Sequence, residues 1–91
     1  MSDTSFPRTE HVVLLGEKIA ARLQERNLPL EVAERGINHH KCQYRFAFRR
    51  NSEQNWVEVA IHFQVAERLA VSQSDAALNR ILDPFLNRHF P

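Results

Sequence analysis

The clearest pattern in the chain is an alternation of apolar and polar residues on both sides of a short polar segment, residues 51–55. Alternation with a period of two is typical of a β-strand that buries one face, and two such runs joined by a polar connection predict a β-hairpin. This central hairpin is predicted to extend over residues 41–63. One of its faces carries the apolar side chains, which are Cys42, Tyr44, Phe46, Phe48, Val57, Val59, Ile61 and Phe63.

The loop limits the register of this hairpin. If Arg49 faces Trp56, every apolar side chain lies on one face, and a shift by one residue would expose all of them. The opposite face then has Arg45 diagonal to Glu58, and Arg49 can lie over the Trp56 ring. A shift by two residues keeps the faces and places Arg45 directly opposite Glu58, so two registers remain open.

Before the hairpin, apolar residues recur every three or four positions over residues 12–23, with charged residues filling much of the rest. This spacing predicts an amphipathic helix over about residues 9–26. Thr9 is predicted to be its N-cap. Asn27 is predicted to take the left-handed conformation that ends the helix.

Residues 30–35 fit two structures. Apolar and charged residues alternate there, as in a short strand, but Pro29 and Gly36 would also frame one or two turns of helix. We favour the strand because a two-stranded sheet is only marginally stable and a third strand would complete it. Residues 36–40 would then connect this strand to the hairpin.

After the hairpin the pattern becomes helical. The spacing of Val65 and Leu69 indicates either a short helix or a continuation of the strand. Ser74 is predicted to cap a last helix with an apolar stripe. Because Pro84 lacks an amide hydrogen, we expect this helix to kink or restart near Asp83, which would cap the restart.

These elements predict an α+β fold, a two-layer sandwich in the order helix, three-stranded antiparallel sheet, helix or helices. Residues 1–8 are predicted to form a flexible lead-in, and residues 9–91 a single domain. The helices should cover the aromatic face of the hairpin. The other face of the sheet is then bare, and function is expected there.

Composition narrows the function classes. The formal net charge is +1, which is far from the basic balance of a typical nucleic-acid-binding protein. Cys42 is the only cysteine, so no intramolecular disulfide forms and a reducing compartment is expected. No apolar run is long enough to span a membrane, and the first residues lack the apolar core of a signal peptide. We expect a soluble, cytoplasmic protein.

The bare face is predicted to bind another protein, because tryptophan and arginine are enriched at interface hot spots. The chain would then be a non-enzymatic interaction module such as an inhibitor, an adaptor or a chaperone-like subunit. Self-association as a homodimer, through this face or an uncovered edge strand, would also cover the sheet. An ordinary solvated sheet face is the alternative interpretation. The predicted partner-binding residues are Arg45, Arg49, Trp56, Glu58 and His62.

RNA or DNA is the alternative partner, with Lys41, Arg45, Arg49 and Arg50 on the phosphates. The order helix, three strands, helix is similar to that of double-stranded-RNA-binding domains. Such domains resemble one another in a lysine-rich start to the last helix, whereas residues 74–77 of this chain contain no lysine. We therefore rank nucleic acid below a protein partner.

Metal and catalytic chemistry are not expected. His39, His40, Cys42 and His62 are the candidate ligands, but His62 is predicted on the opposite face from Cys42 and the spacing matches no zinc pattern. Glu58 and His62 would lie about 13 Å apart along one strand, too far for an acid–base pair. We predict no metal, no cofactor and no catalytic residue.

Overall fold

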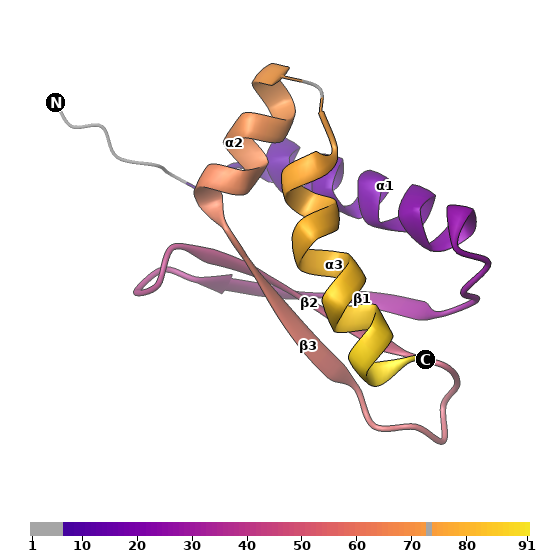
Figure 1. The fold of residues 1–91 in the computed structure, drawn as a ribbon. Helices are drawn as coiled ribbons and strands as arrows, with labels where there is room; N and C mark the ends of the chain where they lie inside the picture. Colours follow the sequence, from indigo (N-terminus) through magenta and orange to yellow (C-terminus); the bar gives the residue numbers. More distant parts are fainter. Residues whose placement is uncertain (1–6, 73) are drawn as a thin grey trace, which may run out of the picture.

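The computed structural model describes residues 7–72 and 74–91, and Figure 1 shows how they fold. Within these residues, three strands form one antiparallel sheet in the order β1-β2-β3, and the three helices lie on one side of it. The predicted α+β sandwich of a helix, a three-stranded sheet and further helices is confirmed. The elements are α1 (Thr9–Glu25), β1 (Glu31–Asn38), β2 (Gln43–Arg49), β3 (Val57–His62), α2 (Phe63–Ser72) and α3 (Ala76–His89).

The predicted lead-in covers residues 1–8, and its residues 1–6 lie outside the described part of the chain. The division of the chain into a lead-in and one domain stays a prediction.

The first helix has the predicted extent but a different first residue. Arg8 is the N-cap, with extended backbone, and Thr9 is already helical, so the predicted Thr9 cap is wrong. The end is as predicted. Asn27 has a φ of 56°, and its amide donates to the carbonyl of Gln24 at 3.1 Å, which closes the last turn.

Residues 30–35 lie mostly in a strand, so the strand interpretation is confirmed, but β1 continues to Asn38. The predicted connection over residues 36–40 is therefore too long. Gly36 has a φ of 85°, and the pairing register shifts between Glu34 and Ile37, as at a β-bulge. The glycine that was expected to end the strand instead bends it.

The hairpin has the first of the two registers. Phe48 pairs with Val57, and Arg45 pairs with Ala60, so the register shifted by two residues is excluded. Its strands are shorter than the predicted hairpin of residues 41–63. Lys41 and Cys42 lie in the turn before β2, where Cys42 has a φ of 55°. After β3, the chain forms the short helix α2 rather than a continuation of the strand.

The core lies between the aromatic face of the sheet and the helices. Tyr44 is almost fully buried, and its hydroxyl accepts a hydrogen bond from the Arg8 amide at 3.0 Å, which satisfies its polar end. Tyr44 also packs on Phe63, with ring centroids 4.8 Å apart. The largest side chains that are completely or almost completely buried are Tyr44, Phe48, Phe63, Phe90, Leu15, Ile19, Ile61, Leu78, Leu82 and Leu86.

The last helix differs from the prediction at its N-cap, and of the predicted kink or restart near Asp83 the restart is wrong. Asp75 rather than Ser74 is the N-cap residue. α3 runs through Pro84 without a restart, and Asp83 caps nothing. Proline removes one backbone hydrogen bond from the helix. The burial of Leu82 and Leu86 on either side of it outweighs that loss.

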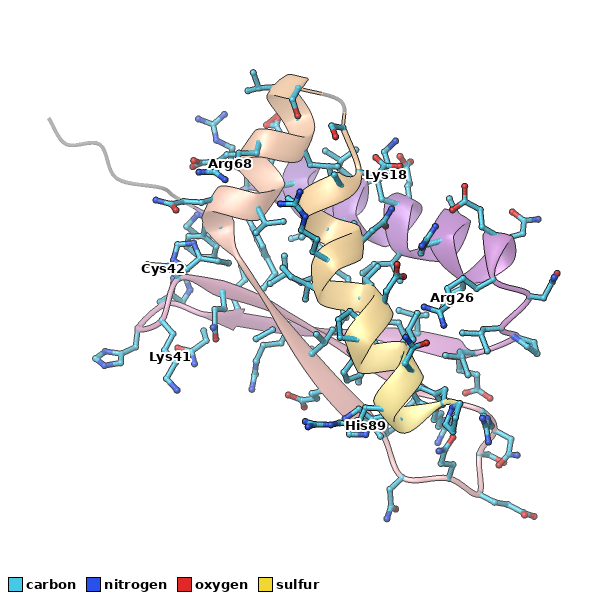
Figure 2. All side chains as sticks on the ribbon, in the orientation of Figure 1. Lys18, Arg26, Lys41, Cys42, Arg68 and His89 are labelled. Atoms are coloured by element: carbon cyan, nitrogen blue, oxygen red, sulfur yellow. The ribbon has the colours of Figure 1, made fainter. Side chains whose placement is uncertain are left out.

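Asp83 instead joins α3 to α1. Its Oδ2 accepts from Arg22 Nη2 at 2.6 Å, and its Oδ1 accepts from Arg26 Nη1 at 3.1 Å. Figure 2 shows Arg26 near the end of α1, on the side of α3. The hydrogen bonds from Arg22 lower the pKa of Asp83, although partial desolvation opposes this shift.

Asp83→Asn should therefore lower stability in a pH-dependent way. A carboxylate whose pKa is lower in the folded state stabilises the fold above its unfolded pKa of about 4 and loses this effect as the pH falls. We expect the variant to lose about 1 kcal/mol at pH 7, as for a half-exposed ion-pair network. Urea unfolding at pH 7 and pH 3 measures this. An equal loss at both pH values would contradict the assignment, and Glu25→Gln, at the exposed partner of Arg22, is the control.

Candidate protein-interaction face

The face of the sheet turned away from the helices carries the candidate site, and we call it the bare sheet face. Tyr44, Phe46 and Phe48 of β2 point into the core, so the residues that alternate with them point the other way. No helix covers this side in the described part of the chain (Figure 1). Its residues are Glu31, Ala33, Gln43, Arg45, Ala47, Arg49, Trp56, Glu58, Ala60 and His62, with the Arg35 guanidinium joining them from the bulge.

Trp56, just before β3, is the largest side chain on this face. The guanidinium carbon of Arg49 lies 4.1 Å from the centroid of its ring, as predicted. That of Arg35 lies 5.1 Å from the same centroid. Because these arginines come from β2 and β1, the indole joins the segment before β3 to the two other strands. Both distances are within the range of a cation–π interaction.

Two of the arginines on the face are paired with carboxylates. Arg49 Nε donates to Glu31 Oε1 at 2.9 Å. Arg45 Nη1 lies 3.8 Å from Glu58 Oε1, and Arg45 Nη2 donates to the carbonyl of Arg35 at 2.9 Å. The diagonal contact of Arg45 with Glu58 is the one that the sequence predicts. Acidic and basic groups therefore neutralise each other over most of this surface.

Ala47 shows how tightly this layer is packed. Its side chain points to the bare sheet face in the middle strand, yet it is 0% exposed. Its neighbours on this face are Arg45 and Arg49 along β2, Ala33 on β1 and Glu58 on β3. Since no helix lies over it, the atoms that cover Ala47 belong to the long side chains of the face itself. The long side chains therefore shield the middle of the sheet from solvent, although 42% of the Arg45 side chain stays exposed.

His62 is exposed at the end of β3, but it also has a local structural role. Its Nδ1 accepts a hydrogen bond from the Gln64 amide at 3.1 Å. This is the bond that a capping side chain makes to the free amides at the start of a helix, and α2 begins at the next residue. The sequence prediction did not include this capping contact.

The alternative phosphate-binding set is dispersed. Figure 2 shows Lys41 at the turn between β1 and β2, at the far end of the sheet from the C-terminus. Arg50 follows the other end of β2 and donates to the carbonyl of Pro91 at 3.1 Å. The seven residues of β2 lie between the two, which corresponds to about 23 Å of strand. Between them, Arg45 and Arg49 are already paired with carboxylates.

The candidate metal ligands do not form a site. Cys42 lies in the turn, where its thiol is 3.8 Å from the carbonyl of His39. Within residues 7–72 and 74–91, no three His, Cys, Asp or Glu side chains come together in a way that could hold a metal ion. The same part of the chain has no helix with the length and apolar character needed to cross a bilayer.

The sequence prediction missed two residues of the site, Glu31 and Arg35. The sequence shows that both residues are charged. Their place on this face depends on how β1 pairs with β2 and on where β1 bulges. Gly36 was the available signal, because an isolated glycine in a strand pattern often marks a bulge.

The chain matches no protein-family model, no curated protein and no solved structure.

Proposed function

We propose that this chain is a small non-enzymatic interaction module, an inhibitor, adaptor or chaperone-like subunit, that binds a protein partner through the bare sheet face. The supporting observation is the Trp56 indole, held on an uncovered sheet by Arg49 and Arg35. We further propose that the protein works in the cytoplasm, where its one cysteine stays reduced.

A side chain held in this way is well suited to binding. Association is weakened when flexible side chains must be ordered, and each one costs roughly 0.5–1.5 kcal/mol. Trp56 and its two arginines already contact one another in the free chain. A partner that covers them would also exclude water, which strengthens the cation–π interaction.

The surrounding charges would orient the partner. Arg45 and Glu58 lie beside each other with more than a third of each side chain exposed, so both keep hydrogen-bonding capacity. Paired charges of this kind contribute to specificity and to the rate of association more than to affinity. His62 lies at the end of the same strand, and we place it at the rim of the contact.

Nucleic acid is less well supported, and a titration tests it. We expect no binding of single- or double-stranded RNA or DNA at physiological salt, because Lys41 and Arg50 lie far apart and the arginines between them are paired. Fluorescence anisotropy with labelled oligonucleotides, at low and at physiological salt, measures this. Binding that persists at physiological salt would contradict the proposal.

The protein partner is tested by affinity capture. The wild-type chain, Trp56→Ala and Val13→Ala would be immobilised and exposed to the same cell extract. Val13 is 54% exposed on α1, away from the bare sheet face. The proposal predicts a protein retained by wild type and Val13→Ala and lost with Trp56→Ala. A protein retained equally by all three would contradict it.

A further inference from the structure

The outer edge of β3 presents free backbone groups. The order β1-β2-β3 makes β3 an edge strand, as Figure 1 shows. The Phe63 amide donates to the Cys42 carbonyl at 2.8 Å, so the backbone of Phe63 points toward β2. Because backbone groups alternate in direction along a strand, those of Glu58, Ala60 and His62 point outward. All three residues are exposed.

The other edge is less suited to pairing. β1 contains the irregularity between Glu34 and Ile37, with Gly36 at a φ of 85°. Bulges and charged residues are devices by which edge strands avoid pairing with another chain. β3 pairs with β2 without a register shift from one end to the other and is therefore the more regular template.

The sequence of β3 is self-complementary about Ala60. In an antiparallel pair of two such strands centred there, Val59 of one copy meets Ile61 of the other on the helical side of the sheet. Glu58 meets His62 on the bare side. The small Ala60 side chains meet at the axis. Apolar residues thus face apolar residues, and an acid faces an imidazole that can donate a hydrogen bond.

The registers centred on the two other outward-pointing residues are poorer. Centring the pair on Glu58 would bring two carboxylates together, and centring it on His62 would bring two imidazoles together. Like charges directly opposite each other destabilise a strand pair. The register centred on Ala60 joins an acid to a hydrogen-bond donor twice, once on each side of the two-fold axis.

We propose that two copies of the chain pair antiparallel through their β3 edges, with the two-fold axis at Ala60. The Ala60 residues exchange their backbone hydrogen bonds, and the His62 amide of each copy donates to the Glu58 carbonyl of the other. The two three-stranded sheets join into one, and the two bare sheet faces become continuous. This extends the proposed function, since the assembled face would present two Trp56 sites.

The pairing is expected to be reversible. A strand of this length spans only about 20 Å, and the contact falls below the roughly 1,200 Å² of a stable interface. Sedimentation should show the monomer mass at about 10 μM and a rise toward the dimer mass as the concentration approaches about 1 mM. A monomer mass throughout that range would overturn the proposal.

Ala60→Glu tests the register. Ala60 lies directly opposite Arg45 on β2, so the new carboxylate has a partner within its own copy and the fold should persist. At the axis, however, two carboxylates meet, and we expect the dimer to weaken by about 30-fold or more. Ala33→Glu is the matched control, because it makes the same change on the same face of β1. Unchanged dimerisation of Ala60→Glu, or loss with Ala33→Glu only, would overturn the proposal.

A cross-link provides a second test that does not depend on the folding of Ala60→Glu. In a Cys42→Ser background, Ala60→Cys places two thiols on opposed residues about 5.5 Å apart between Cα atoms, within the range that a disulfide bridges. Diamide should then produce a covalent dimer, and Ala33→Cys should not. Equal yields from both variants would overturn the register.

The experiments distinguish a failure of the proposed β3 pairing from a failure of the proposed partner-binding face. Trp56 lies outside the paired segment, so Trp56→Ala should leave the sedimentation profile unchanged while it removes the captured protein. A wild-type chain that stays monomeric would overturn β3 pairing and leave the partner-binding face in place.

Discussion

Phe48→Ala is expected to remove much of the stability of the fold and to lower its melting temperature sharply. Phe48 is 0% exposed in the central strand, and its ring centroid lies 5.3 Å from that of Phe85 on α3, so it joins the sheet to the helical layer. Truncating a buried phenylalanine costs about 3–5 kcal/mol. A domain of this size has a free energy of unfolding of roughly 5–15 kcal/mol, so the substitution removes a large part of it.

Circular dichroism during thermal unfolding measures this effect. Val13→Ala, at an exposed position of α1, is the control and should melt within a few degrees of wild type. A Phe48→Ala chain with a cooperative transition at the wild-type temperature would show that the sheet and the helices are not joined through this residue.

Trp56→Ala should have the opposite profile, with a large loss of binding and a small loss of stability. The ring lies on the bare sheet face outside the core, so its removal leaves no buried cavity. A tryptophan hot spot contributes 2 kcal/mol or more, which corresponds to about a 30-fold or larger rise in Kd. Calorimetric titration with the captured protein measures the change.

Two further variants test whether the indole itself accounts for the affinity for the partner. Trp56→Phe keeps an aromatic face for Arg49 and should retain part of the affinity. Arg35→Ala removes one of the two guanidiniums over the ring and should weaken binding by a smaller factor than Trp56→Ala. Wild-type affinity in Trp56→Ala would mean that the partner binds elsewhere.

The hairpin was predictable because its signals are local and agree with one another. Alternation fixes which face of each strand is apolar, and the loop limits the register to two choices. Structure decides between them by pairing Arg45 with Ala60. The end of α1 was predictable for a similar reason, since Asn27 tolerates the left-handed backbone that closes the last turn.

Features that depend on three-dimensional packing were not predictable. Arg22 and Asp83 are 61 residues apart, and only the relative placement of α1 and α3 brings them into contact. Of the predicted kink or restart near Asp83, the restart was wrong for a related reason. The local cost of the missing amide was visible, but the packing of Leu82 and Leu86 that outweighs it was not.

The candidate site lies between these two cases. Trp56 and its contact with Arg49 follow from the hairpin alone. The second arginine, Arg35, reaches the ring only because β1 continues past Gly36 with a bulge. A polar strand pattern indicates which residues share a face, but the twist at a bulge determines which of them meet.

Site-specific photo-cross-linking in the living cell tests the partner-binding face most directly. A benzoylphenylalanine would be introduced at Ala33, on the bare sheet face, and in a second strain at Val13, on the exposed side of α1. We predict a discrete cross-link to another protein from position 33 that disappears when Trp56→Ala is added, and no such product from position 13. A product that forms from position 13 alone, or that persists from position 33 without Trp56, would contradict the assignment of this face as the binding surface.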